Sequence, residues 1–201
     1  MTKIKLCGLT RPGDIDTANE LKPDYIGFVF AGASRRYVSP AEAAALKKRL
    51  DPGIPAVGVF VDEPPASVAA LLNTGTIDLA QLHGSEDEAY IRLLRSLTDK
   101  PIIQAFRIRT AGDAAAAERS SADLVLLDAG AGSGTAFDWS LLEGVSRPYF
   151  LAGGLNPENA AAAVRELRPY GVDVSSGIES GGCKDHKKMA AFVAAVRREN
   201  P

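Results

Sequence analysis

The sequence predicts an α/β fold and, within that class, a single (β/α)8 TIM barrel over residues 1–201. Two observations predict it. Short apolar runs alternate with Ala- and Leu-rich stretches along the whole chain, and strict alternation of this kind is typical of a parallel sheet. The alternation repeats eight times, the number at which such a sheet closes. A doubly wound open sheet is the less favoured alternative, because no G-x-G-x-x-G motif follows the first strand.

The predicted strands are continuous apolar runs without clean alternation, as expected for strands buried on both faces. They cover residues 3–7, 25–30, 56–61, 78–82, 102–106, 123–128, 149–152 and 172–175.

The predicted helices fill the gaps between these strands, and several begin with start signals. Pro12 occupies a first-turn position, Ser39 precedes Glu42 by three residues, and Asn156 precedes Pro157. The predicted helices cover residues 12–22, 40–50, 65–73, 86–97, 111–120, 139–144, 157–167 and 186–199.

The composition excludes several classes of protein. Hydrophobic residues make up 46% of the chain and charged residues 24%, and the formal charge of −2 provides no basic surface for nucleic acid. No apolar run approaches the ~18 residues that a membrane span needs, and the N-terminus lacks the features of a secretory signal. The two cysteines lie far apart in sequence, which favours free thiols. We therefore expect a cytoplasmic protein without nucleic-acid or membrane partners.

Polar groups stand where the predicted strands end, the place where a TIM barrel builds its active site. Cys7 ends the first strand directly before Gly8, and Asp128 ends an apolar sixth strand. Cys7 is either a small buried hydrophobe or a working thiol, and Arg36 is a candidate for the cation that would activate it. Asp128 is either a turn-capping residue or a carboxyl whose pKa is raised by desolvation.

Two glycine-containing loops carry the most specific signal. Gly153 and Gly154 follow the seventh strand, and Ser176 and Gly177 follow the eighth. Glycines let backbone N–H groups approach an anion, and the loops after strands 7 and 8 are where TIM barrels bind phosphate. Tight turns without a ligand are the alternative. Gln81 and His83, at the fourth strand, are either substrate contacts or turn residues. No Cys/His cluster has the spacing of a metal site.

Together these motifs make the chain resemble the phosphoribosylanthranilate isomerases, the Amadori isomerases of tryptophan biosynthesis. The matching segments are collinear and cover nearly the whole chain. They are K-L-C-G-L-T at 5–10, G-F-V-F at 27–30, S-R-R-Y-V at 34–38, V-G-V-F-V at 57–61, Q-L-H-G at 81–84, L-L-D at 126–128, G-S-G-T-A-F-D-W at 132–139, L-A-G-G-L-N-P-E-N at 151–159, G-V-D-V-S-S-G-I-E at 171–179 and K-D at 184–185.

The resemblance implies a cofactor-free and metal-free enzyme that acts on a small molecule. It would convert N-(5-phosphoribosyl)anthranilate to 1-(o-carboxyphenylamino)-1-deoxyribulose 5-phosphate. The general base falls on Cys7, the general acid on Asp128, and an assisting arginine on Arg36. The phosphate contacts fall on Gly153, Gly154, Ser176 and Gly177. Such roles require the pKa of the acid to rise above about 3.9 and that of the base to fall below about 8.5.

The sequence departs from the family pattern at two positions. Ser133 stands where threonine is usual, and Cys183 stands where an apolar residue is usual. If Cys183 shares a face with Cys7, the pair is liable to oxidation. The alternatives are another sugar-phosphate barrel enzyme, such as indole-glycerol-phosphate synthase or the Amadori isomerase of histidine biosynthesis, and a phosphometabolite-binding barrel without catalysis. The sequence leaves both a monomer and a homodimer open.

Overall fold

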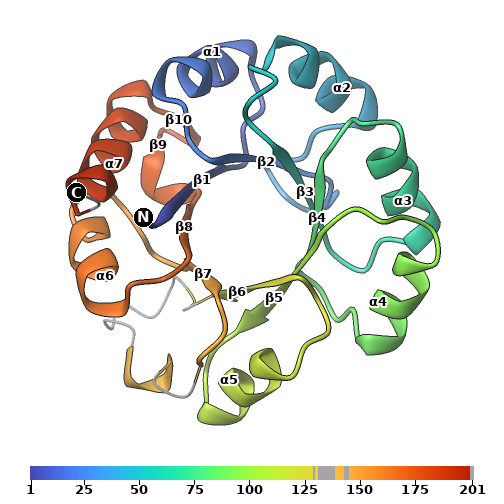
Figure 1. Cartoon of the computed structure of the whole chain (residues 1–201). Coiled ribbons are helices and arrows are strands. Elements are labelled where there is room, and N and C mark those ends of the chain that lie inside the picture. Colours follow the sequence, from blue (N-terminus) through green and yellow to red (C-terminus); the bar gives the residue numbers. More distant parts are fainter. Residues whose placement is uncertain (129, 131–138, 143–144, 200–201) are drawn as a thin grey trace.

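Parallel strands β1 to β8 pair in the order of the sequence, and β8 pairs with β1 to close a barrel around which the helices lie (Figure 1). The computed structural model describes residues 1–128, 130, 139–142 and 145–199. Ser133 and most of the glycine-rich segment after Asp128 lie outside these residues. The closed barrel confirms the predicted fold class and excludes the open sheet.

The barrel strands lie close to their predicted positions. They are β1 (Lys3–Cys7), β2 (Tyr25–Val29), β3 (Ala56–Phe60), β4 (Leu79–Leu82), β5 (Ile102–Arg107), β6 (Leu124–Asp128), β7 (Tyr149–Ala152) and β8 (Gly171–Val174). The connecting elements are α1 (Pro12–Leu21), α2 (Pro40–Arg49), α3 (Pro65–Asn73), α4 (Glu88–Arg95), α5 (Ala111–Glu118), the 3-10 turn η1 (Trp139–Leu142), α6 (Ala160–Leu167) and α7 (His186–Arg198). No helix among the described residues is long and apolar enough to span a membrane.

Local sequence signals explain where several helices begin. The Ser39 hydroxyl accepts the N–H of Glu42, whose carboxylate accepts the N–H of Ser39, so a reciprocal capping box starts α2. Asp185 accepts the N–H of Lys188 at the start of α7. These caps satisfy backbone donors that a helix N-terminus otherwise leaves without partners.

Three predicted elements differ from the structure. The predicted helix at 157–167 begins only at Ala160, because the Asn156 side chain accepts the N–H groups of Glu158 and Asn159 and holds the segment in a turn. Of the predicted helix at 139–144, residues 139–142 form a short 3-10 turn and residues 143–144 lie outside the described residues, and the helix predicted at 86–97 is confined to α4. A small antiparallel hairpin, β9 (Glu179–Ser180) with β10 (Cys183–Lys184), follows the turn η2 (Ser176–Ile178) and was not predicted.

Side chains alternate between the barrel interior and the layer beneath the helices. The lower interior is apolar and is formed by Val57, Leu79, Ile103, Leu126 and Phe150. Tyr25 and Tyr170 pack edge-to-face on the Phe150 ring, with centroid distances of 5.5 and 5.3 Å. This apolar plug fills the amino end of the barrel and leaves the carboxyl end for polar groups.

Replacing Phe150 by alanine is expected to lower the free energy of unfolding by about 3–5 kcal/mol, because the ring is fully buried in this plug. Urea unfolding followed by circular dichroism measures the change. The matched control is Leu93→Ala on α4, where the side chain is exposed and the loss should stay within about 0.5 kcal/mol. A Phe150→Ala loss as small as that of the control would contradict the packing described here.

Candidate functional site

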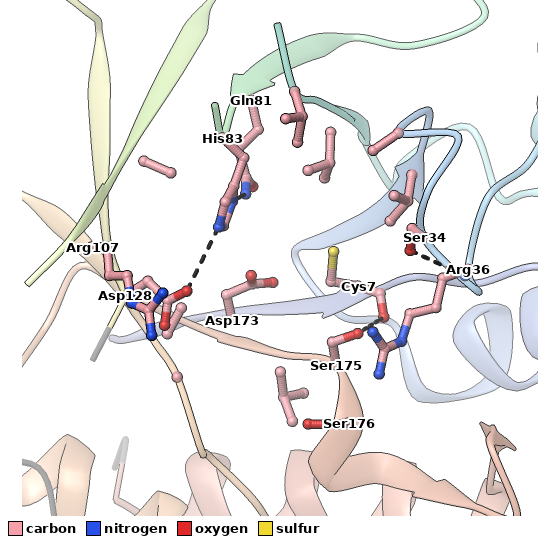
Figure 2. A pocket seen from close by; sticks show the side chains of 18 of the residues that line it. Cys7, Ser34, Arg36, Gln81, His83, Arg107, Asp128, Asp173, Ser175 and Ser176 are labelled. Carbon is pink, nitrogen blue, oxygen red and sulfur yellow. Dashed lines mark hydrogen bonds and ion pairs between the residues drawn. The ribbon is translucent and has the colours of Figure 1, made fainter. Parts of the chain in front are cut away.

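One pocket of about 610 Å³ opens at the carboxyl ends of the strands, and we call it the C-terminal pocket. Cys7 and Asp128 enter it from opposite sides, with Gln81 and His83 on a third side (Figure 2). Its described lining is Cys7, Val29, Ala31, Ser34, Arg36, Val59, Val61, Gln81, His83, Gly84, Ala105, Arg107, Asp128, Gly130, Ala152, Gly153, Gly154, Leu155, Asp173, Val174, Ser175 and Ser176. Of the residues singled out from the sequence, all but Gly177 lie in this wall.

The thiol of Cys7 lies at the end of β1, against the backbone of β2. Gly27 is its register partner, and a Cβ at Gly27 would stand 2.6 Å from the Cys7 sulfur. Only glycine therefore leaves room for the thiol. Burial raises the pKa of Cys7, and the positive charge of Lys5 opposes that rise most strongly. Arg36 was the cation expected to act on the thiol, but Lys5 has the largest lowering effect.

The carboxyl of Asp128 ends β6 and is partly exposed to the pocket. Its Oδ1 accepts the Gly130 N–H at 2.8 Å, and its Oδ2 lies 3.6 Å from His83 Nε2. The interaction with His83 is the largest cause that lowers the pKa of Asp128, and the Gly130 N–H adds to it against the opposing effect of burial.

Both pKa shifts run opposite to the sequence-based expectation. The expected acid has a lowered pKa, and the expected base has a raised one. The expectation was wrong because it considered only what the chemistry would need. The directions follow instead from the hydrogen bonds around Asp128 and the desolvation of Cys7.

His83 is oriented by Gln81. The Gln81 amide nitrogen lies 2.8 Å from His83 Nδ1, and because an amide NH2 can only donate, Nδ1 is the acceptor. In the neutral ring the proton then sits on Nε2, which faces Asp128. Gln81 Oε1 is buried and has no hydrogen-bond partner among the described residues. Because Gln81 lines the pocket, this oxygen is available to accept a hydrogen bond from a ligand.

Arg36 is held by the buried carboxylate of Glu179. Arg36 Nε and Nη2 donate to Oε1 and Oε2 of Glu179 at 2.6 and 3.0 Å. Lys184 Nζ donates to the same carboxylate at 2.8 Å, and Arg35 donates at 2.7 Å. Burial disfavours the charge on Glu179, but the hydrogen bonds from Arg36 and Lys184 outweigh it and lower the pKa of Glu179 to about 2.

The loops after β7 and β8 form the wall beside Cys7. Gly153 and Gly154 have φ values of 91° and 70°, a region that favours glycine, and a Cβ on Gly154 would meet nothing within 4 Å. Ser176 lines the pocket at the start of η2. Gly177 stands behind this wall, where a Cβ would lie 1.9 Å from the carbonyl oxygen of Leu155. It thereby allows close contact between the two loops.

Sequence reasoning gave no role to several polar residues of this region. Asp173 and Arg107 line the pocket, and Glu179 and Lys184 fix Arg36 from behind. A charged residue between Val172 and Val174 in an apolar strand was the available signal for Asp173. Among the described residues, no group of three His, Cys, Asp or Glu side chains could hold a metal ion.

The two free cysteines occupy different environments. Cys183 is exposed on β10 and is not part of the pocket wall, whereas Cys7 is buried in that wall.

Comparisons with known proteins match one family over nearly the whole chain. A family model described as N-(5'phosphoribosyl)anthranilate (PRA) isomerase matches residues 4–195. The N-(5'-phosphoribosyl)anthranilate isomerase of Endomicrobium trichonymphae is 44% identical, over 98% of this chain and 99% of its own length. The enzyme of that name from Dechloromonas aromatica (strain RCB) is 45% identical, over 98% of this chain and 97% of its own.

Solved structures are similar over the same extent. The phosphoribosyl anthranilate isomerase of Thermotoga maritima superposes with a TM-score of 0.91 at 35% identity, covering 98% of this chain and 100% of that one. A phosphoribosyl anthranilate isomerase in complex with reduced 1-(o-carboxyphenylamino)-1-deoxyribulose 5-phosphate superposes with a TM-score of 0.88 at 34% identity, with the same coverage.

Replacing Glu179 by glutamine is expected to destabilise the protein by about 3 kcal/mol at neutral pH, because it removes the charge that Arg36 and Lys184 share. The folded pKa of Glu179, about 2, lies below its ordinary value of about 4.3. Its contribution is therefore complete above the ordinary value and is lost as the pH falls through the folded one.

Urea unfolding of the parent and Glu179→Gln at a series of pH values measures this contribution. The difference between them should be constant above about pH 5 and should shrink toward about pH 2. The exposed Glu158→Gln is the matched control. A difference between parent and Glu179→Gln that does not depend on pH would contradict the ion-pair account.

Proposed function

The chain belongs to the N-(5'-phosphoribosyl)anthranilate isomerase family, and on that premise we propose that Cys7 is the general base and Asp128 the general acid of its reaction. The reaction is the Amadori rearrangement of N-(5-phosphoribosyl)anthranilate to 1-(o-carboxyphenylamino)-1-deoxyribulose 5-phosphate, a step of tryptophan biosynthesis. One observation supports the two roles above all: a thiol and a carboxyl face each other across a single pocket with glycine-containing loops beside it.

The first step uses Asp128. Its proton passes to the ring oxygen of the sugar, the bond between that oxygen and C1′ breaks, and the nitrogen lone pair forms a protonated Schiff base at C1′. Substrate that occupies the pocket would exclude water from Asp128 and weaken its contact with His83. Both changes favour the protonated form of the carboxyl that the step requires.

The second step uses Cys7. Its thiolate removes the proton from C2′, and the electron pair forms a C1′–C2′ double bond as the Schiff base becomes an enolamine. In the tautomerisation that follows, C1′ takes up the proton that Cys7 removed and the enol O–H releases a proton that restores Asp128, which gives the C2′ ketone and leaves the atom count unchanged. The raised pKa of Cys7 makes its thiolate a stronger base, although fewer molecules carry it at neutral pH.

The substrate carries two anionic groups, and the pocket offers a separate place for each. We assign the phosphate to the loops of Gly153, Gly154, Ser176 and Gly177, where backbone N–H groups and a hydroxyl are available. Arg36 is then left for the carboxylate of the anthranilate ring. Glu179 engages its Nε and Nη2, and Nη1 forms no hydrogen bond with the described residues, so this nitrogen remains for a ligand.

Gln81 and His83 complete the proposed substrate contacts. Gln81 Oε1 is buried without a donor among the described residues, and a sugar hydroxyl of the substrate can supply one. His83 Nε2–H faces the acid and would stay close to the ring oxygen as the ring opens. This contact would give Gln81 Oε1 a hydrogen-bond donor when substrate is bound.

We further propose that the enzyme acts in the cytoplasm, where its two free thiols would stay reduced, as a monomer or a homodimer. Both monomeric and dimeric forms occur among solved relatives. Sedimentation velocity distinguishes the two states.

Cys7→Ser and Asp128→Asn are each expected to lower kcat by about 10²–10⁴-fold, because each removes one proton-transfer step. Their affinity for the product should stay close to that of the parent. Anthranilate fluorescence follows turnover, and calorimetric titration with product gives the affinity. Cys183→Ser, at an exposed cysteine outside the pocket, is the matched control and should retain full activity. A loss of affinity equal to the loss of rate would assign the residue to binding instead.

Gly177→Ala is expected to raise KM by about tenfold or more with a smaller effect on kcat. A Cβ 1.9 Å from the Leu155 carbonyl must push the two phosphate loops apart. Steady-state kinetics and competitive inhibition by inorganic phosphate measure the effect, and KM and the inhibition constant should rise together. Gly13→Ala on α1, where a Cβ meets nothing within 4 Å, is the control. A folded Gly177→Ala enzyme with unchanged KM would place the phosphate elsewhere.

A further inference from the structure

Lys5 is a fully buried lysine that the reaction scheme does not use. Its side chain lies inside the barrel with no exposed surface. An ammonium in such a place loses its hydration and needs strong partners to remain charged. A buried pair of charges is weak evidence for stability, since apolar side chains of similar volume often serve as well. The position of this pair therefore calls for another explanation.

The strand geometry places Lys5 directly below Cys7. The two residues are two apart on β1, so their side chains point to the same face of the sheet, which is the barrel interior. The register of β1 with β8 sets Asp173 beside Lys5, and Lys5 Nζ donates to Asp173 Oδ1 at 2.9 Å. Asp173 reaches up into the wall of the C-terminal pocket, between Asp128 and Cys7 (Figure 2).

The other charged groups near Cys7 are already engaged. The charge of Lys184 lowers the pKa of Cys7, and the charge of Arg36 also interacts with the thiol. Both side chains donate hydrogen bonds to the carboxylate of Glu179. Asp173 lies in the pocket wall and pairs with Lys5 from there. Among the described residues, Asp173 is the carboxylate that Lys5 pairs with, and Cys7 is the next residue of β1 on the same face of the sheet. Lys5 is thus a buried cation on the strand that carries the thiol.

We propose that Lys5 is a positioning residue for the base of the reaction: its ammonium, kept charged by Asp173, stabilises the thiolate of Cys7 inside the pocket. The inference rests on the proposed role of Cys7. Lys5 does not touch the substrate, and it acts through the sulfur alone.

The charge states support this arrangement. Burial alone would lower the pKa of Lys5, but Asp173 and then Cys7 outweigh burial and raise it, so the lysine stays protonated. Of the groups around Cys7, Lys5 opposes the effect of burial on the thiol pKa most strongly, and Asp173 acts in the opposite sense. Removing the charge of Lys5 should therefore raise the titration midpoint of the Cys7 thiol.

The experiment measures the titration of Cys7 directly. In a Cys183→Ser background Cys7 is the only cysteine, and the ultraviolet absorbance of its thiolate is followed against pH, with Cys7→Ser in the same background as the blank. Lys5→Met, which keeps the volume and removes the charge, should raise the titration midpoint by about one unit or more, a tenfold loss of thiolate at neutral pH.

Kinetics provide the second readout. The acidic limb of the kcat/KM profile should move with the midpoint in Lys5→Met, because that profile reports the free enzyme. A merely structural role for Lys5 would reduce activity without moving the midpoint. A midpoint that does not move in Lys5→Met overturns the proposal.

A third variant covers the case in which a single substitution prevents folding. Lys5→Met with Asp173→Asn leaves no charge unpaired, and its midpoint should still lie above that of the parent, because the effect of the lysine is the larger of the two. A midpoint at or below the parent value overturns the proposal. A kcat that is unchanged in Cys7→Ser would instead refute the role of Cys7 as the base, whatever the midpoints show.

Discussion

The pairing of β1 with β8 is the constraint on which the site depends. It joins the first strand to the last and places Lys5 beside Asp173, 168 residues away in sequence. The same seam lets the Ser175 hydroxyl donate to the carbonyl of Cys7 at 3.1 Å, and Lys184 Nζ donates to the carbonyl of Ser175 at 2.9 Å. The thiol, the loop after β8 and the carboxylate that holds Arg36 are therefore all positioned by the closure of the barrel, and an open sheet would separate them.

The fold could be predicted from the sequence because its signal is local and repeated. The carboxyl ends of the apolar runs all come to one face when the barrel closes, which is why Cys7, Asp128 and His83 share a pocket. Boundaries were less predictable where a side chain competes with the backbone, as Asn156 does before α6. The β9–β10 hairpin has two residues in each strand, too few to produce a periodic pattern.

The electrostatics of the site could not be predicted from the sequence, because they depend on distances between residues far apart along the chain. Glu179 begins the two-residue strand β9 beyond the barrel, and nothing local indicates that it forms ion pairs with Arg35, Arg36 and Lys184. The pKa directions of Cys7 and Asp128 were expected the wrong way round for the same reason. They are set by burial in the first case and by a contact from another strand in the second.

The opposite pKa shifts of the two groups have a physical rationale in proton transfer. A thiol whose pKa is raised gives a strongly basic thiolate in small amount, and a carboxyl whose pKa is lowered gives a strong acid in small amount. Each group thus gains driving force at the expense of population. A positive charge beneath the sulfur restores thiolate population, and its carboxylate partner limits how far it does so. The Lys5–Asp173 pair therefore holds the pKa of Cys7 between the value that Lys5 alone and the value that Asp173 alone would give it.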